Sequence, residues 1–189
     1  EQETSEEVFK TGGHGYATGL ELLVEKRRGR LSGWLGYTLG WTRREFAEID
    51  GGRSFPPKYD RRHDVSLTTT YRLARWIWTA NFVYGTGQAY TPASARYILR
   101  RPAADLPIER VLAARRNTAR LLSYHRMDLG VRRKLRLFGA DAEMYLQIFN
   151  LYNRRNEWFI QYAPEGSDAE PEVIGMLPIM PTFGFDFRF

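Results

Sequence analysis

The sequence predicts an all-β fold, an antiparallel transmembrane β-barrel meander, and three observations support this. Segments of about ten residues alternate between apolar and polar side chains, which is the period of a half-exposed strand. The connections between these segments alternate between short turns and long polar loops. The final segment, 183–189, places a phenylalanine at every second position. Together these features predict a meander of strands with one apolar face.

Composition narrows the possible classes of protein. The 189 residues include 14% aromatic residues, and the apolar mass lies in Phe, Tyr and Trp more than in Ile and Val, which suits a β protein. A run of about 18 apolar residues is absent, so a transmembrane helix is not expected. The chain has no Cys, which excludes disulfides and thiolate metal sites and leaves the compartment open. It begins at Glu1 without signal-peptide features, so we expect an exported protein to have a further N-terminal part.

The strands follow from the alternation. The expected strands are 16–26, 31–42, 63–73, 76–84, 124–137, a strand from 141, and a last strand reaching the C-terminus. The segment 31–42 shows the period of two most clearly, because a helix would mix its two faces. One of its faces carries Leu31, Gly33, Leu35, Tyr37, Leu39 and Trp41. The opposite face carries Ser32, Gly36, Thr38, Gly40 and Thr42, with Trp34 as the one bulky member.

Two segments are ambiguous. The strand from Asp141 could continue through 150–153, with a bulge, to Tyr162. Residues 110–122 could form a short helix on spacing alone.

The connections at 27–30, at 74–75 and near Gly139 are short, whereas those at 43–62, 85–122 and 163–172 are long. A meander with short turns on one rim and long loops on the other is typical of outer-membrane barrels, whose short turns face the periplasm. This parity places the C-terminus on the periplasmic side.

A soluble antiparallel sandwich or lipocalin-like barrel would also alternate. Three features favour a membrane instead. The polar face of 31–42 is mostly small and uncharged, as in a wet barrel lumen. An exposed Phe-x-Phe edge strand would be adhesive in a soluble protein. Aromatic residues also gather at strand ends, as in an interfacial girdle, namely Tyr16, Trp41, Trp76, Tyr84, Trp158 and Tyr162.

Several motifs, in this order and spacing, resemble the C-terminal part of the β-barrel of the TonB-dependent outer-membrane receptors. These motifs are Gly19–Leu22 with Gly33–Leu39, Tyr59–Asp64, Tyr84–Gly87, Tyr124–Gly130 and Phe149–Asn153. The last one is similar to the family's Asn-Leu-Phe-Asn/Asp signature in the penultimate strand. The terminal Phe strand completes the resemblance, which extends over nearly the whole chain.

The resemblance implies that 1–189 supplies about seven strands of a larger, plugged barrel of the roughly 22-stranded type, with plug and N-terminal strands absent. It implies energised uptake of a bulky nutrient of the siderophore, vitamin or oligosaccharide class, in the bacterial outer membrane. The implied partners are lipid and lipopolysaccharide, the TonB complex through the missing N-terminal part, and the barrel-assembly machinery. That machinery would read Phe185, Phe187 and Phe189. No enzymatic activity, cofactor or metal is expected.

The cluster Asp60–Asp64 could be catalytic with Ser54 or Ser66, but no triad geometry is fixed, and an ion-pair network at the extracellular rim is the expected reading. His14, His63 and His125 lack metal-ligand spacing. Residues 84–87 lack the full glycine pattern of a phosphate loop and indicate a strand that leaves the membrane.

The long loops hold the candidate substrate-binding residues. Arginine and tyrosine suit an anionic ligand, although the same side chains could contact lipopolysaccharide phosphates or only solvent. The candidates are Tyr59, Arg61, Tyr90, Tyr97, Arg100 and Arg101, with Arg115 and Arg116 in the same loop as Tyr90. On the lumen face, Trp34 is expected to pack against the plug. Ion pairs or plug contacts are expected for Glu21, Glu25, Asp128, Arg132, Glu143, Asp186 and Arg188.

Two rival functions remain open. One is a passive porin-like or adhesin-like barrel with the same pattern of strands. The other is a soluble antiparallel β-sheet binding protein. The net charge of +6 could indicate nucleic acid. However, the arginines fall in turns and loops and form no basic stacking platform, so nucleic-acid binding is not expected.

Overall fold

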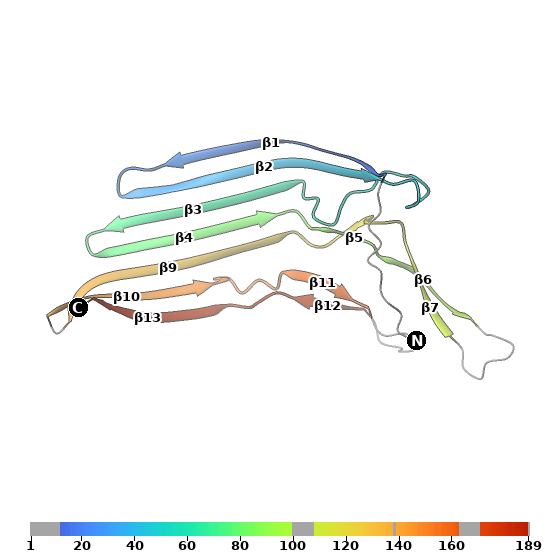
Figure 1. Cartoon of the computed structure of the whole chain (residues 1–189). Helices are drawn as coiled ribbons and strands as arrows, with labels where there is room; N and C mark the ends of the chain where they lie inside the picture. Colours follow the sequence, from blue (N-terminus) through green and yellow to red (C-terminus); the bar gives the residue numbers. More distant parts are fainter. Residues whose placement is uncertain (1–11, 100–107, 138, 163–170, 189) are drawn as a thin grey trace.

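The computed structural model describes residues 12–99, 108–137, 139–162 and 171–188, and it leaves the side chains of 96–99, 108–111 and 188 undescribed. These residues form strands, turns and loops without a helix, so the all-β prediction is confirmed. Seven strands build one antiparallel sheet (Figure 1). In sheet order they are β1 (His14–Lys26), β2 (Leu31–Glu45), β3 (His63–Leu73), β4 (Trp76–Gly85), β9 (Tyr124–Leu137), β10 (Ala140–Phe149) and β13 (Met180–Arg188).

Three two-stranded sheets lie within the long connections, on the right in Figure 1. They pair β5 (Ala89–Tyr90) with β8 (Ala119–Arg120), β6 (Ala93–Leu99) with β7 (Ile108–Ala113), and β11 (Glu157–Gln161) with β12 (Glu172–Gly175). The short connections β1–β2, β3–β4 and β9–β10 lie together at the opposite end of the main sheet. The predicted alternation of short and long connections is therefore confirmed. Within the described residues, no helix is long and apolar enough to cross a membrane.

Strand register divides the main sheet into two different faces, because directly paired residues point to the same side. One row across five strands is wholly apolar and joins Val24, Leu35, Leu67, Phe82 and Met127. The adjacent row on the other face joins Glu25, Trp34, Thr68, Asn81 and Asp128. The period-two assignment made from the sequence for 31–42 is thus the one that the pairing imposes.

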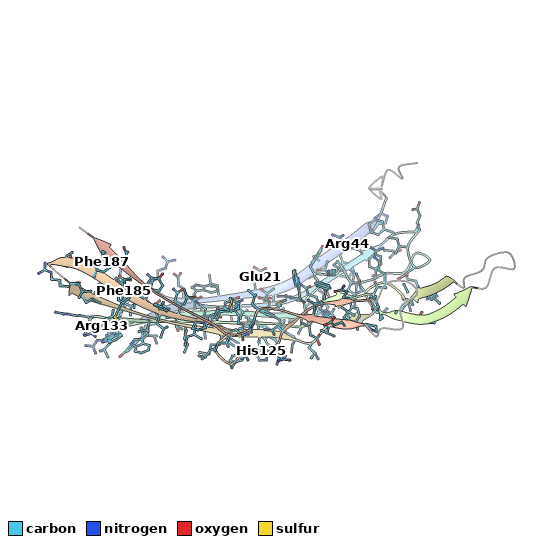
Figure 2. All side chains as sticks on the ribbon, turned by 90° about the horizontal axis from the view of Figure 1, so that it is seen from below. Glu21, Arg44, His125, Arg133, Phe185 and Phe187 are labelled. Atoms are coloured by element: carbon cyan, nitrogen blue, oxygen red, sulfur yellow. The ribbon has the colours of Figure 1, made fainter. Side chains whose placement is uncertain are left out.

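The sheet is curved, with Glu21 on its concave side and Arg133 and His125 on its convex side (Figure 2). The register places the apolar rows on the same side as His125, because Tyr84 pairs with His125 and Phe82 with Met127. The convex face is therefore the apolar face. The concave face carries mostly small, polar and charged side chains.

Nothing in the described chain covers the convex face. The accessible surface of the chain is 14749 Å², whereas a compact protein of 22.0 kDa would expose about 9,300 Å². Among the described residues, only Phe55, Ala89 and Ala142 are buried hydrophobic residues. Leu22 is 53% exposed and Phe183 is 77% exposed. The main sheet therefore has apolar area without a core to bury it.

Both edges of the main sheet are open. β1 pairs only with β2, and β13 pairs only with β10, so each edge strand presents unpaired backbone groups along one side. Long strands with free edges are templates for further strand pairing. Both edges of the main sheet are therefore available for pairing with further strands.

The short helix considered for 110–122 is wrong. Ile108–Ala113 is strand β7, which forms a hairpin with β6, and Ala119–Arg120 is strand β8, which pairs with β5. The hairpin partner β6 supplies backbone hydrogen bonds that helical spacing in the sequence cannot reveal. The β-branched Ile108 and Val111 also favour the extended form.

The continuation of the penultimate strand to Tyr162 is also wrong. β10 ends at Phe149, and Asn150 and Asn153 adopt positive φ angles of 53° and 51°. Asn tolerates this left-handed conformation better than other non-glycine residues do. The chain turns there and resumes as β11, which pairs with β12 and not with the main sheet.

We expect residues 1–189 alone not to fold cooperatively in plain buffer, because the convex face and two strand edges would meet water. Thermal unfolding of the purified polypeptide, followed by circular dichroism without detergent, checks this. A sharp, reversible transition of a monomer would contradict the expectation.

Candidate ligand site at the long-loop end

A buried ion pair joins the bases of two long loops. Asp60 is 2% exposed, and its carboxylate pairs with the guanidinium of Arg120. Asp60 Oδ1 also accepts a hydrogen bond of 2.8 Å from the backbone N–H of Thr42. Arg120 Nη1 donates to the carbonyl oxygens of Asp60 and Gly87, at 2.7 and 3.0 Å. A buried carboxylate stabilises a structure only when it is fully bonded, as it is here.

Residues 85–87, at the end of β4, help to hold the bases of the two long loops together. Thr86 Oγ1 accepts hydrogen bonds from the backbone N–H groups of Arg62 and His63, at 2.7 and 3.2 Å. Gly87 is packed so closely that a Cβ atom there would lie 1.7 Å from the carbonyl oxygen of Leu121. The segment is the end of a strand, since β4 stops at Gly85. In the described residues it is followed by strand and loop, without the helix of a phosphate loop.

The cluster Asp60–Asp64 forms the ion pairs expected from the sequence. Asp60 bonds Arg120, and Arg61 Nη1 lies 3.2 Å from Asp64 Oδ2. The guanidinium of Arg62 lies 4.6 Å from the centre of the Trp41 ring and donates to the carbonyl oxygen of Gly40. These groups are engaged in holding the loops.

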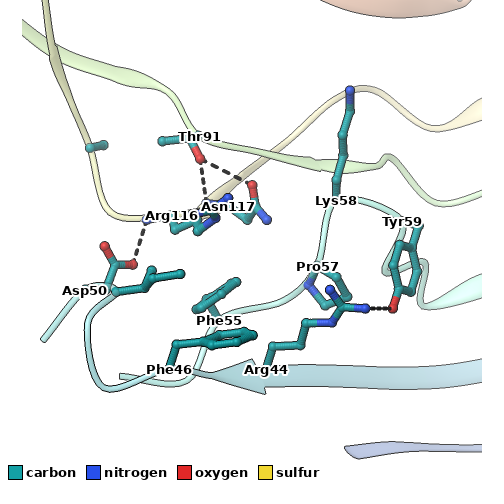
Figure 3. A pocket seen from close by; sticks show the side chains of 12 residues that line it. Arg44, Phe46, Asp50, Phe55, Pro57, Lys58, Tyr59, Thr91, Arg116 and Asn117 are labelled. Carbon is teal, nitrogen blue, oxygen red and sulfur yellow. Dashed lines mark hydrogen bonds between the residues drawn. The ribbon is translucent and has the colours of Figure 1, made fainter. Parts of the chain in front are cut away.

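An open pocket of about 870 Å³ lies above this base, between the β2–β3 loop and the β4–β9 connection (Figure 3). One wall is the stacked pair Phe46 and Phe55, with ring centres 6.3 Å apart. The guanidinium of Arg116 lies 5.5 Å from the centre of the Phe55 ring. The main chain is tied across the pocket, because Asn117 Nδ2 donates to the carbonyl oxygen of Pro56 at 2.8 Å.

Positive charge dominates the pocket. Three basic side chains line it, namely Arg44, Lys58 and Arg116, against the single carboxylate of Asp50. That carboxylate accepts a hydrogen bond of 2.8 Å from the backbone N–H of Arg116. Arg44 stacks on the Tyr59 ring at 5.5 Å and donates to its hydroxyl at 2.8 Å. Cations on flat aromatic walls suit an anionic ligand with planar groups.

Only some of the substrate-binding candidates suggested from the sequence line the pocket. Tyr59 and Arg116 line the pocket, whereas Arg61 is paired with Asp64 outside it. Tyr90 lies in β5, in register with Ala119. Tyr97 lies in β6 without a described side chain, and Arg100 and Arg101 lie outside the described residues. Whether any of these residues touches a ligand stays a prediction.

Sequence reasoning missed Arg44, Phe46, Phe55 and Lys58. The sequence placed Arg44 in the polar loop 43–62, but β2 extends to Glu45 and carries Arg44 into the pocket. The compact stretch 55–59, with its two prolines between an aromatic and a basic residue, is the signal that could have identified the wall.

The aromatic residues proposed as a girdle lie in three places. Trp76 stacks on Trp78 at 6.1 Å near the short turns, and Trp41 and Tyr84 lie near the long-loop ends of their strands. Trp158 and Tyr162 lie outside the main sheet, because Trp158 belongs to β11 and Tyr162 follows it directly. Tyr162 uses its hydroxyl to accept a hydrogen bond of 3.2 Å from the N–H of Ala93.

The turn after β10 is held by a buried asparagine. Asn150 is 1% exposed, and its Nδ2 donates to the carbonyl oxygens of Arg154 and Leu177, at 2.9 and 3.1 Å. Beside it, the Tyr152 hydroxyl and His125 Nδ1 share a hydrogen bond of 2.7 Å. Partial burial raises the pKa of Tyr152 above its ordinary value.

Ion pairs expected from the sequence for Glu143 and Asp128 are present on the concave face. Arg132 lies 3.6 Å from Glu143, and Arg126 lies 3.0 Å from Asp128. The described residues contain no group of three or more His, Cys, Asp or Glu side chains placed to hold a metal ion.

No protein-family model, no curated protein and no solved structure matched the chain.

Replacing Asp60 by asparagine should loosen the loop base, because Arg120 loses its charged partner. We expect the free energy of opening at this point to fall by about 2 kcal/mol, less than for a fully buried pair because Arg120 is partly exposed. Hydrogen exchange of the Thr42 amide in the intact protein measures the change. The control is Asp64→Asn, whose half-exposed pair with Arg61 should contribute less than about 1 kcal/mol. Equal effects of the two variants would contradict the assignment.

We expect benzenetricarboxylate, a planar trianion, to bind in the pocket. Arg116→Gln should weaken this binding about tenfold, because a charge-assisted contact is lost. Calorimetric titration of the intact protein at low salt measures this affinity. Arg155→Gln is the matched control, since Arg155 is an exposed arginine outside the pocket. A control variant that binds as weakly as Arg116→Gln would show that only net charge matters.

Proposed function

We propose that residues 1–189 are the C-terminal part of an outer-membrane β-barrel receptor of the TonB-dependent kind, which takes up a bulky nutrient across the outer membrane with energy supplied from the inner membrane. The observation that carries the proposal is the uncovered convex face. A sheet of this size with an apolar exterior, a polar interior and two open edges suits a larger barrel in lipid. Further strands of the same protein would pair with β1 and β13.

Strand length supports the proposal. The seven strands of the main sheet contain 9 to 15 residues, and about 9–11 tilted residues cross the hydrocarbon layer. The longest strand, β2, would project beyond the layer at the long-loop end, where Arg44 lines the pocket. The long loops would then face the outside and the short turns the periplasm.

The pocket gives the proposed receptor a recognition site. Its basic and aromatic lining favours an anionic cargo, which is a narrower class than bulky nutrients in general. A passive porin-like barrel would have the same strands, and it differs in lacking a plug and a TonB-binding segment. Uptake that stops when TonB is deleted supports the receptor, and uptake that continues unchanged supports the porin.

We expect the intact protein to fractionate with the outer membrane, to need detergent for extraction, and to migrate faster on gels before heating than after. Folded barrels resist detergent unfolding because every strand is paired. A protein that stays monomeric in buffer without detergent would instead support the soluble β-sheet binding protein.

The direction of the strands can be tested with single cysteines, since residues 1–189 contain none. Arg53 lies in the β2–β3 loop and Arg28 in the β1–β2 turn, and both are exposed. On intact cells, a membrane-impermeant maleimide should label Arg53→Cys and should label Arg28→Cys only after the outer membrane is permeabilised. The reverse pattern would overturn the proposed orientation.

A further inference from the structure

The short-turn rim of the main sheet is strongly basic. We define this rim as residues 25–30, 72–75, 132–137, 140–143 and 186–187, which contain ten basic and four acidic residues. The ten basic residues are Lys26, Arg27, Arg28, Arg30, Arg72, Arg75, Arg132, Arg133, Lys134 and Arg136, and all ten are exposed.

Only some of these cations have an acidic partner. Arg27 lies 2.7 Å from Glu25, and Arg132 and Arg136 lie 3.6 and 3.2 Å from Glu143 and Asp141. Arg72 donates to Ser32 Oγ, and Lys134 shares a concave hollow with Glu143 and Asp186. The other five have no carboxylate partner among the described residues, namely Lys26, Arg28, Arg30, Arg75 and Arg133.

Five arginines at the long-loop end are used differently. Arg61, Arg120 and Arg126 each pair with a carboxylate. Arg62 and Arg154 donate to backbone carbonyl oxygens of Gly40 and Ser123. These five arginines hold the loops together, whereas the five cations at the short-turn rim keep their charge available for a partner outside the described chain.

Two of the five cations lie at the border of the apolar convex face. Lys26 follows Leu22 and Val24 at the period of two, on the same side of β1. Arg133 follows Val131 on the convex side of β9, and its guanidinium lies 4.9 Å from the centre of the Trp76 ring. The aliphatic stems of such residues can cover apolar surface while the charges stay in water.

We propose that the short-turn rim binds the headgroups of anionic phospholipids. This inference rests on the proposed membrane location and narrows the expected lipid partner to one headgroup class bound at one rim. Arginine matches the phosphodiester with paired donors, and clusters of unpaired cations beside an apolar surface attract anionic lipid. In the proposed orientation, this rim meets the phospholipid leaflet on the periplasmic side.

The test uses the intact protein in a nonionic detergent, with equal amounts of phosphatidylglycerol and phosphatidylcholine added. Native mass spectrometry counts the lipids that remain bound. We expect phosphatidylglycerol to be retained at least about tenfold over phosphatidylcholine at low salt. The preference should shrink as salt is added.

The triple variant Arg28→Gln, Arg75→Gln, Arg133→Gln should bring the two lipids close to parity. The matched control is Arg53→Gln, Arg115→Gln, Arg155→Gln, which removes the same charge from exposed positions at the long-loop end and should keep the preference. Equal retention of both lipids by the unaltered protein, or an equal loss in the control, would overturn the proposal. So would displacement of bound lipid by a short DNA duplex at lower concentration than free phosphatidylglycerol requires.

Heat-modifiable migration of each sample separates the two proposals. A protein that shifts on heating but shows no lipid preference is a barrel without this rim site. A protein that neither shifts nor needs detergent overturns the membrane location as well. The substituted side chains are exposed, so the variants should keep the heat shift of the unaltered protein.

Discussion

Each strand of the main sheet obtains its backbone hydrogen bonds from its neighbours, and this register decides where every side chain lies. A shift of β3 by one residue against β2 would move Leu67 to the concave face and Thr68 to the convex one, opposite to their present partners Leu35 and Trp34. The apolar convex face, the polar concave face and the basic border at the short turns all depend on this one register. Because the same register is kept across five strands, the apolar row is continuous from Val24 to Met127.

The parts of the fold that follow the local alternation of apolar and polar side chains could be predicted from the sequence. Seven strands, their short turns and the parity of the loops follow from the alternation, because the strands are long and half-exposed. Asn150 shows where the rule stops. Its alternating neighbours suggested a continuing strand, but its amide is satisfied by Arg154 and Leu177, and the second partner is 27 positions away. A contact that distant has no local signature.

The candidate site was predictable only in its chemistry. The loops' arginines and tyrosines indicated anion binding, and Tyr59 and Arg116 do line a basic, aromatic pocket. Ion pairs between loops, such as Asp60 with Arg120, decide which basic side chains are free to bind a ligand. The spacing of residues in the sequence does not reveal these pairs. The same holds for the short-turn rim, where Arg28 and Arg75 differ from Arg61 and Arg126 only in lacking a carboxylate within reach.

The Asp60–Arg120 pair also separates the long loops into two parts with different freedom to vary. Its hydrogen bonds to Thr42 and Gly87 fasten the loops where they leave β2 and β4. The segments beyond it, such as the β6–β7 hairpin, can therefore gain, lose or exchange residues without disturbing the pairing of the strands below. Such an arrangement lets the surface of the long-loop end diversify quickly while the sheet beneath is preserved.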